Sequence, residues 1–325
     1  MNIKKAGNQI KRMLHWRTEN NMDHILEDKE VEKVEYELSK NLMYRIHGQD
    51  ALGRPTTIIN IGRCDLRFIM KQFSQNDIVR AHLYYDEVVD QLSIKYAKEK
   101  GYDYIGNCTI VDLEGLSVYK HMDLSAVQLL GKIVDIYSNY YPETADLVLV
   151  VNAPSIFSFF WSIISPFFSD LQKKKLKILK DYSELKVYFK EENIPAIYGG
   201  KCNCKDGCVI GKSTQNGNIH SDIVKISSGK KITVDIPCLA NETTSWTLRS
   251  LKNDIAFGAV FIPRDQNILP TTVWQLQRIN AQEETYTGKY SSGFEGTLQL
   301  TFDNSYSSFT AKTIAYDIIK TQDEE

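Results

Sequence analysis

Three segments of this 325-residue chain hold residues that could bind a phosphate or a metal, or take part in catalysis. The first, Gly207–Ser213, has the glycines, lysine and serine of a phosphate-binding loop. Such a loop needs four residues between its glycines, a buried strand before it and a helix after it. Here only three residues separate the glycines, and strand-like sequence follows. The segment therefore does not predict a nucleotide site.

The second segment overlaps the first and contains Cys202, Cys204 and Cys208, which could offer three thiolates to zinc. A structural zinc site takes four ligands, commonly as two close pairs. The nearest histidine in the sequence, His220, has no partner at a zinc-finger spacing. The pattern favours a loop of ordinary thiols, so we expect neither a metal nor a cofactor.

The third segment, Asp112–Glu114, places two carboxylates at the end of a predicted strand. Paired carboxylates can act as general acid and base. No serine, cysteine or histidine constellation accompanies them in the sequence, so a structural role in capping the next turn is favoured. On its motifs the chain is not expected to be an enzyme.

Residues 155–180 combine an aromatic stretch with a lysine cluster. If the stretch is helical, one face holds five large apolar side chains, namely Phe157, Phe160, Trp161, Ile164 and Phe168. Two more, Phe159 and Ile163, fall on another face. Five lysines follow, at positions 173, 174, 175, 177 and 180. This composition suits a helix at a membrane surface, with lysines near anionic headgroups. It equally suits a core helix followed by a solvated strand edge, and the sequence leaves both open.

The elements that must position these segments alternate between strands and helices up to about residue 197. Apolar or β-branched runs predict strands at 56–61, 108–113 and 147–151. Helical spacing of apolar residues predicts helices at 76–100 and 124–138, the first ending at a glycine, Gly101. Charged helices are expected at 4–16 and 27–42. This alternation indicates an α/β domain with largely parallel strands.

The C-terminal third differs, because apolar and polar residues alternate with a period of two. The alternation is clearest at residues 232–236, 255–261, 298–302 and 314–318. Turn residues between such runs indicate antiparallel strands and a small β-sandwich. We place the boundary between the two parts within residues 199–218.

Composition narrows the class of protein. Lys plus Arg is 39 and Asp plus Glu is 41, a formal net charge of −2, which argues against nucleic acid as a partner.

The uncharged stretch at 147–169 is long enough to span a bilayer, but Pro154 and Pro166 interrupt it. We read it as a strand, a turn and a separate helix. The polar, basic start does not resemble a signal peptide, so we expect a cytoplasmic protein with reduced cysteines.

Several ordered motifs resemble those of CRAL-TRIO lipid-binding domains. They are Asp-Ala-Leu-Gly-Arg-Pro at 50–55, Cys-Thr-Ile-Val-Asp-Leu-Glu-Gly at 108–115, Tyr-Tyr-Pro-Glu at 140–143, Asn-Ala-Pro at 152–154, Pro-Phe at 166–167 and Ile-Pro-Ala-Ile-Tyr-Gly-Gly at 194–200. The resemblance covers roughly residues 34–200 and is to the phosphatidylinositol transfer protein branch. The tail, with Trp246, Ile-Ala-Phe-Gly at 255–258 and Phe-Asp-Asn-Ser-Tyr-Ser at 302–307, resembles a GOLD domain.

The resemblance implies an α/β fold with a CRAL-TRIO-like mixed sheet, whose helices enclose a lipid cavity, followed by a GOLD-like antiparallel β-sandwich. It divides the chain into a truncated N-terminal helical segment at 1–45, a lipid-binding domain at 46–205 and a sandwich at 219–320. The family begins with a three-helix unit, of which residues 4–16 resemble only the last helix. The mobile gate of the family falls on residues 155–170.

The resemblance also implies site residues. The inositol headgroup would be held by Glu143, Lys175 and Thr109. The family's choline-lipid positions read Ile46, Thr57 and Asn107–Thr109, and only Thr109 is retained, so phosphatidylcholine is not the expected ligand. The gate and membrane contacts would be formed by Phe157, Phe160, Trp161, Ile164, Phe167, Phe168, Lys173 and Lys174.

The function expected from the sequence is that of a soluble lipid-binding or lipid-transfer protein for phosphatidylinositol. Its partners would be a phosphoinositide or other phospholipid, a membrane surface touched transiently, such as that of the Golgi or endosomes, and a protein bound through the GOLD domain. Two alternatives stay open: a carrier of another hydrophobe, such as a retinoid or tocopherol, and a membrane-trafficking adaptor that exchanges nothing.

Overall fold

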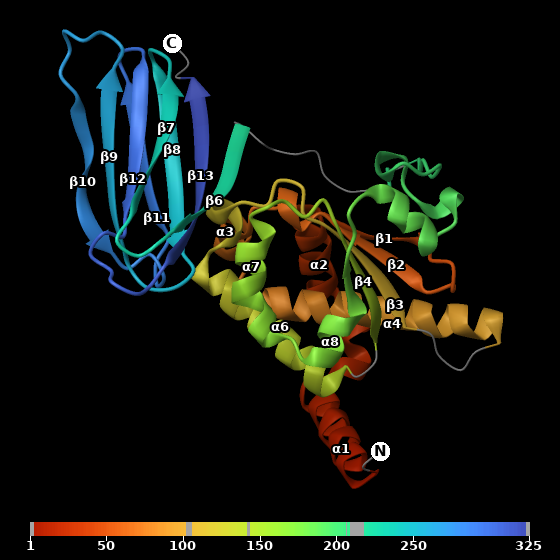
Figure 1. The fold of residues 1–325 in the computed structure, drawn as a ribbon. Helices are drawn as coiled ribbons and strands as arrows, with labels where there is room; N and C mark the ends of the chain where they lie inside the picture. Colours follow the sequence, from red (N-terminus) through yellow and green to blue (C-terminus); the bar gives the residue numbers. More distant parts are fainter. Residues whose placement is uncertain (1–2, 102–105, 142–143, 206, 209–217, 323–325) are drawn as a thin grey trace. The chain divides into compact units, whose positions relative to one another are not determined.

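The structure, a computed structural model, describes residues 3–101, 106–141, 144–205, 207–208 and 218–322 (Figure 1). The chain forms two compact units. Unit 1 takes its residues from 1–114, 125–154 and 164–212, and unit 2 takes its residues from 115–124, 155–163 and 213–325. Unit 2 thus contains the C-terminal third together with two short segments from the N-terminal part of the chain.

Unit 1 is built on a five-stranded mixed sheet in the order β1-β2-β3-β4-β5. The strands are β1 Tyr44–Gln49, β2 Pro55–Ile59, β3 Asn107–Asp112, β4 Ala145–Val151 and β5 Leu176–Ile178. β1 runs antiparallel to β2, and β2 to β5 are parallel. The three predicted strands correspond to β2, β3 and β4, so the α/β expectation is confirmed.

Helices occupy the connections between the parallel strands. They are α3 Leu66–Gln72, α4 Gln75–Lys100, α5 Val118–His121, α6 Leu124–Tyr140, α7 Phe157–Ile164 and α8 Asp170–Lys175, with η2 Ile61–Arg63 and η3 Ser165–Phe167. α4 begins where the Ser74 side chain accepts a hydrogen bond from the amide of Asp77, and it ends at Gly101, whose φ of 76° suits glycine. Both predicted helices of this region, at 76–100 and 124–138, are confirmed.

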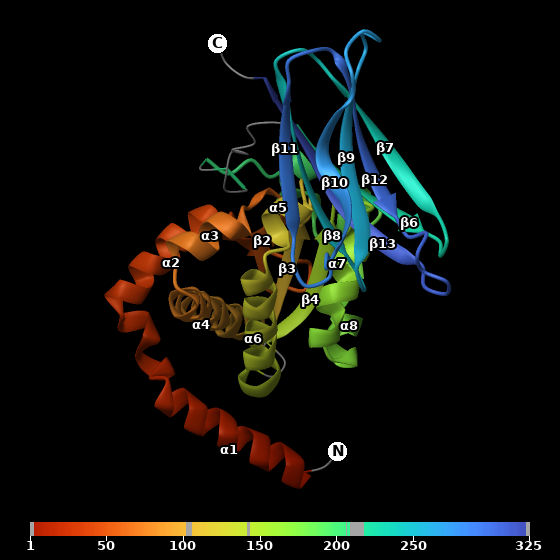
Figure 2. The ribbon, with the colours of Figure 1, turned by 90° about the vertical axis from the view of Figure 1, so that its left-hand side faces the viewer.

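The N-terminal helices precede β1; the last of them lies beside α4, whereas the first extends away from α4 (Figure 2). They are α1 Ile3–Glu19, η1 Met22–Glu27 and α2 Lys29–Asn41. The Trp16 ring stacks on the Tyr140 ring of α6 with centroids 4.4 Å apart. Arg17 forms an ion pair with Glu87 of α4 at 2.7 Å. The predicted segment at 4–16 is thus anchored to the rest of unit 1 by its last turn.

The two faces of the sheet differ in packing. One face is buried against the segment after β5, which contains η4 Tyr182–Val187, η5 Glu191–Asn193 and η6 Ala196–Tyr198. That core includes Ile58, Cys108, Ile110, Leu147, Leu149, Val151, Leu185 and Phe189. The helices have a separate core, which includes Ile25, Leu38, Ile78, Leu83 and Leu129. α4 lies on the second face of the sheet, because its Tyr85 hydroxyl meets Thr57 of β2.

Unit 2 is an antiparallel β-sandwich, as predicted. Its strands are β6 Asn218–Ile226, β7 Lys231–Cys238, β8 Glu242–Ser250, β9 Ile255–Pro263, β10 Thr271–Ile279, β11 Tyr286–Ser292, β12 Gly296–Asp303 and β13 Lys312–Gln322. They form two sheets, β10-β9-β12-β7 and β11-β8-β13-β6. The core between them contains Trp246, Phe257, Phe302 and their neighbours, and Trp246 is only 2% exposed, which confirms its predicted core position.

Within the residues that the structure describes, no helix is long and apolar enough to cross a membrane. The uncharged stretch at 147–169 divides into β4, α7 and η3, as expected from its two prolines.

Candidate functional site

The helix-side face of the sheet carries a row of side chains that includes a predicted headgroup residue. Thr109 of β3 is in register with Thr57 of β2 and with Val148 of β4. Val111 faces the same side, because side chains alternate along a strand. Thr109, Val111 and Val148 are all partly exposed, although β3 and β4 are inner strands. Part of this face, at Thr109, Val111 and Val148, is therefore accessible, whereas Thr57 and Val150 on the same side are buried. The opposite face is buried.

The row continues toward β1, where Ile46 is in register with Thr57. The Oγ1 atom of Thr57 lies 2.8 Å from the Tyr85 hydroxyl of α4, and the Tyr44 ring lies 4.6 Å from the Tyr85 ring. Burial raises the pKa of Tyr85, so its hydroxyl is neutral and able to donate or accept a hydrogen bond. In the sequence Tyr85 appears as one more apolar position of a helix, which is why it was not identified as a site residue.

The second predicted headgroup residue, Lys175, is the last residue of α8 and directly precedes Leu176. Leu176 is in register with Val148, which is in register with Thr109. Two strand spacings therefore separate Leu176 from Thr109, about 10 Å. Lys175 is partly exposed, whereas its neighbour Lys174 is fully exposed. β3, which carries Thr109, and β5, which begins directly after Lys175, are thus separated only by β4 in the sheet.

Glu143, the third predicted headgroup residue, lies outside the residues that the structure describes. The chain is well held just before it, at Tyr141. The Tyr141 hydroxyl donates to Glu87 at 2.7 Å, and Arg17 pairs with the same carboxylate.

The predicted gate at 155–170 is not one helix, and this part of the prediction was wrong. α7 ends at Ile164, η3 follows with Pro166 near its start, and α8 begins after Ser169. Proline lacks the N–H that would continue the helix, and the Ser169 side chain caps α8 in a reciprocal bond with Gln172. The two predicted gate lysines, Lys173 and Lys174, and the predicted headgroup residue Lys175 therefore lie in the last turn of α8 rather than at the end of the aromatic helix.

The buried side of α7 also differs from the predicted face. Phe159 and Phe160 are buried, at 2% and 5% exposure, whereas Phe157, Trp161 and Ile164 are partly exposed. The rings of Phe157 and Trp161 lie side by side, with centroids 6.0 Å apart. Phe157, Trp161 and Ile164 are thus the predicted gate residues of this helix whose side chains are partly exposed.

After α7, the chain is attached to α6. Phe167 of η3 is 39% exposed, but one edge of its ring lies over Gly131 of α6, where an added Cβ would be 3.1 Å from the ring. The Gln172 side chain of α8 donates to the Ser138 hydroxyl of α6 at 3.1 Å. Phe168 is partly exposed.

The two segments that unit 2 takes from the N-terminal part are held by specific contacts. In the first, residues 115–124, the amide of Tyr119 donates to the buried Asp317 carboxylate of β13 at 2.6 Å. Arg249 of β8 donates to the backbone oxygen of Met122 at 3.1 Å. The second segment contains α7, and its Phe160 ring packs edge-on against the ring of His121, with centroids 6.3 Å apart.

The carboxylate pair at the end of β3 has a structural role, as expected. The Oδ1 atom of Asp112 accepts the amide of Glu114 at 2.9 Å and so closes the next turn. Asp112 also accepts from Asn152 and from the Tyr198 hydroxyl, both at 2.8 Å, and is buried at 1% exposure. The pKa of Tyr198 is raised, chiefly by burial. Asp112 is thus a saturated acceptor that ties β3 to β4 and η6.

A second buried carboxylate lies between α4 and α6. The Tyr137 hydroxyl donates to Oδ1 of Asp86 at 2.5 Å, and the His82 ring lies 3.7 Å from Oδ2. Among the described residues, this Oδ2 atom is buried without a hydrogen-bond partner. Burial raises the pKa of Asp86. Sequence reasoning missed this group because a charged residue in a long amphipathic helix is usually solvated.

Two protein-family comparisons agree with this architecture. Residues 39–200 match the CRAL/TRIO domain, and residues 227–310 match the C-terminal GOLD domain of the Patellin-1-like type. The chain therefore carries a CRAL/TRIO domain, followed by a GOLD domain.

Among individual relatives, the chain is 29% identical over 284 residues to a CRAL-TRIO domain-containing protein of Caenorhabditis elegans, covering 80% of this chain and 39% of that protein. It is 27% identical to the protein real-time of Aedes aegypti, covering 81% and 44%. It is 28% identical to the phosphatidylinositol/phosphatidylcholine transfer protein SFH7 of Arabidopsis thaliana, covering 63% and 38%. The chain thus spans about two fifths of the length of these relatives.

Among solved structures, the chain is similar to that of Sfh5, at 23% identity and a TM-score of 0.47, covering 63% of this chain and 70% of that one.

Proposed function

We propose that this chain is a lipid carrier, which takes phosphatidylinositol from a membrane, holds its acyl chains against the helix-side face of the sheet in unit 1, and releases the lipid at another membrane. The observation that carries the proposal is the accessible part of that face, at Thr109, Val111 and Val148. Inner strands of a covered sheet normally bury both faces. A face left accessible in this way is suited to an apolar ligand.

The polar groups around that face suit a phospholipid headgroup. An inositol phosphodiester needs a cation for the phosphate and acceptors for the ring hydroxyls. Lys175 supplies the cation, Thr109 supplies a hydroxyl, and Glu143 supplies a carboxylate acceptor. The name of the Arabidopsis relative, which refers to phosphatidylinositol and phosphatidylcholine transfer, supports this ligand class.

Two residues favour phosphatidylinositol over phosphatidylcholine as the ligand. Of the residues at the choline-lipid positions, Ile46, Thr57 and Thr109 stand side by side in the row described above. Ile46 has no hydroxyl, and the Thr57 hydroxyl is already within hydrogen-bond distance of Tyr85. Transfer itself needs no catalytic step, because a lipid that leaves one bilayer and enters another has no bond made or broken.

Each unit carries residues suited to the proposed membrane contact. In unit 2, Phe157 and Trp161 of α7 present apolar surface. In unit 1, Phe167 presents apolar surface, and Lys173 and Lys174 present charge suited to anionic headgroups. Burying one such aromatic ring is worth about 1.5–3 kcal/mol. Two acidic replacements, Phe157→Asp with Trp161→Asp, should therefore lower binding to phosphatidylinositol-containing vesicles by at least about tenfold. Phe160 is unsuitable for this test, because its burial would make an acidic replacement unfold the segment.

The headgroup test compares two adjacent lysines. A charge-assisted hydrogen bond contributes about 1.5–3 kcal/mol, so Lys175→Ala should reduce phosphatidylinositol loading by about ten- to a hundredfold. Lys174→Ala, the matched control, should load normally, because Lys174 is exposed. Mass spectrometry of co-purifying lipid and loading from labelled vesicles measure the effect. Equal loading by both variants would remove phosphatidylinositol from the proposal and favour a carrier of an uncharged hydrophobe.

A second candidate function is an adaptor that acts through the GOLD domain. The observation in its favour is an exposed surface on the sandwich, where Phe309 is 97% exposed. The sandwich also has a shallow hollow of about 510 Å³, lined by Asn253, Asp254, Arg278, Ile279, Asn280 and Gln282. Arg278 pairs with Asp254, and its guanidinium lies 4.2 Å from the Tyr306 ring. Purification of full-length protein without bound lipid, and no uptake from vesicles, would favour this function over the carrier.

A further inference from the structure

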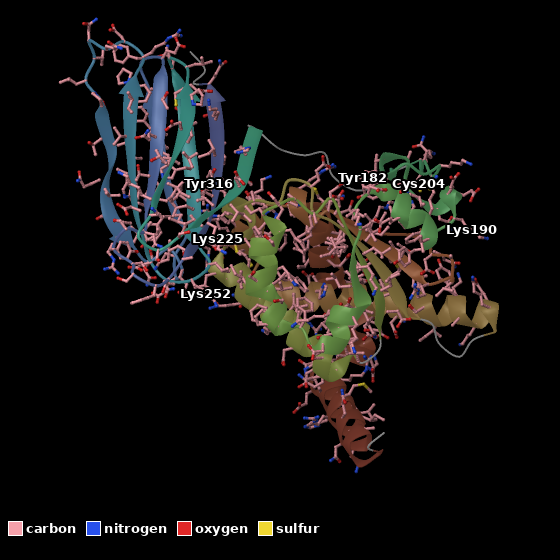
Figure 3. All side chains as sticks on the ribbon, in the orientation of Figure 1. Tyr182, Lys190, Cys204, Lys225, Lys252 and Tyr316 are labelled. Carbon is pink, nitrogen blue, oxygen red and sulfur yellow. The ribbon has the colours of Figure 1, made fainter. Side chains whose placement is uncertain are left out.

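One cluster of side chains in unit 1 has no role in lipid binding. It joins His47 of β1 to Cys202, Cys204 and Cys208, which lie beyond the last helical turn of the unit. His47 and Cys208 are buried, and Cys202 and Cys204 are partly exposed. Figure 3 labels Cys204 in this segment. The four ligand atoms all lie within 4.8 Å of one another.

Two distances within the cluster are close to those around a single tetrahedral ion. The Sγ atoms of Cys202 and Cys204 are 3.5 Å apart, and Nε2 of His47 lies 3.7 Å from Sγ of Cys204. A tetrahedral zinc, with bonds of about 2.3 Å to sulfur and about 2.0 Å to nitrogen, places its ligand atoms about 3.6–3.8 Å apart. A disulfide would need the two sulfur atoms at about 2.05 Å.

Backbone hydrogen bonds hold two of the four ligands, Cys202 and Cys204, in place. Cys202 is fixed by its amide, which donates to the oxygen of Ile194 at 2.9 Å, and by its oxygen, which accepts the amide of Ala196 at 2.9 Å. The amide of Cys204 donates to the Sγ atom of Cys208 at 3.4 Å, an arrangement that stabilises a thiolate.

Two further backbone features lie beside the cluster, one just before Cys208 and one in β1. The amide of Gly207 donates to the oxygen of Cys204 at 2.9 Å, with a φ of 79° at Gly207 that suits glycine. Arg45 of β1 donates to the oxygen of Gly207. On β1, the ladder with β2 shifts register between Ile46 and Gln49, and such a bulge re-aims the side chain within it, here His47.

We propose that His47, Cys202, Cys204 and Cys208 bind one structural Zn²⁺. Three thiolates and one imidazole complete the tetrahedral set that structural zinc sites use, so no position is left for a substrate or water. The ion would tie the segment after η6 to β1, the edge strand of the five-stranded sheet. An edge strand presents unpaired backbone groups that proteins commonly cover, and the Asn193 side chain already donates to the oxygen of Gln49 on this strand at 2.9 Å.

The test uses the full chain, purified without chelators and with a reductant. Metal analysis should find one equivalent of zinc, which should be removable by a strong chelator and restored by Zn²⁺ alone. Replacement by Co²⁺ should give the intense visible bands of a tetrahedral site and a thiolate-to-metal charge-transfer band. These bands report ligand type and geometry whether or not lipid is bound, so the result is independent of the carrier function.

Single replacements identify the ligands. Cys204→Ser and Cys208→Ser should each weaken zinc binding by more than about 100-fold, since removing even an outer partner of a site costs 10–100-fold. Cys238→Ser is the matched control, because Cys238 lies in the sandwich, where its Sγ atom contacts Ile236 and Thr244 and a serine keeps those contacts. It should keep one equivalent of zinc.

Two outcomes would overturn the proposal. One is a reduced, folded protein that takes up no Zn²⁺ or Co²⁺ while the thiols of Cys202, Cys204 and Cys208 all react with a thiol reagent. The other is a Cys202–Cys204 disulfide in protein purified under argon. If a serine variant fails to fold, protection of the three thiols from alkylation by stoichiometric Zn²⁺ in the unmodified chain decides the question instead.

Discussion

Replacing Asp50 with asparagine should destabilise unit 1 by about 3–5 kcal/mol, the usual cost of leaving one member of a buried ion pair without its partner. Asp50 and Arg54 flank the tight turn between β1 and β2, and their side chains are 1% and 11% exposed. Oδ2 of Asp50 accepts from Nε of Arg54 at 2.7 Å and from Nη2 at 2.6 Å. Oδ1 accepts the amides of Leu52 and Arg54, at 3.0 and 2.9 Å.

An asparagine keeps one carbonyl oxygen for the backbone donors, but its amide nitrogen cannot accept from the guanidinium. Among the described residues, the guanidinium would then stay buried with Asp146 as its one acidic partner, 3.8 Å away and 37% exposed. An exposed pair of this kind is worth about 0–1 kcal/mol, so it cannot replace the lost partner. Asp146→Asn serves as the control, because it removes only this weak interaction.

The assay is urea unfolding of the full chain followed by helical circular dichroism, since most described helical residues belong to unit 1. For a slope near 2 kcal/mol per molar urea, the Asp50→Asn midpoint should fall by about 1.5–2.5 M. The Asp146→Asn midpoint should shift by less than about 0.5 M. Midpoints for the two variants within about 0.3 M of each other would refute the reasoning.

Two further predictions concern packing and pH. Gly288→Ala should destabilise the sandwich by at least about 1–3 kcal/mol, because an added Cβ would lie 2.2 Å from the Trp246 ring. Gly293→Ala is the control and should be nearly neutral in thermal unfolding, because an added Cβ would have no atom within 4 Å. Asp86 holds its proton more tightly when folded, since burial raises its pKa. The protonated carboxyl therefore stabilises the folded protein fully below the ordinary aspartate pKa. This stabilisation is lost as the pH rises through the raised pKa, by up to about 1.4 kcal/mol per pH unit. Asp86→Asn should flatten this decrease in urea unfolding at pH 4 to 7, and an unchanged slope would contradict the assignment.

Much of the fold could be predicted from the sequence because its signals are local. β4 contains an unbroken apolar run at 147–151, α4 repeats its apolar residues every three or four positions, and the strands of the sandwich alternate with a period of two. The extent of the aromatic helix was misjudged. Pro166 and the Ser169 cap were both visible, but the expected apolar face was given more weight than these breaks.

The residues that form each site were harder to predict, because they are far apart in the sequence. His47 lies 157 positions before Cys204 and reaches it only because the segment after η6 returns to the edge of the sheet. The Thr57–Tyr85 pair likewise joins a strand to the helix that follows it. Of the proposed headgroup residues, Thr109 and Lys175 were chosen by resemblance, and their role stays a prediction.

The position of β13 has a consequence for the order in which unit 2 can fold. β13 is an inner strand, paired with β6 on one side and β8 on the other, so this sheet cannot close until residues 312–322 have emerged from the ribosome. The same strand supplies Asp317, which holds Tyr119 across a sequence separation of 198 residues. Contacts of such range are slow to form. During synthesis, residues 115–124 must therefore wait for β13 before they can make their contact with Asp317.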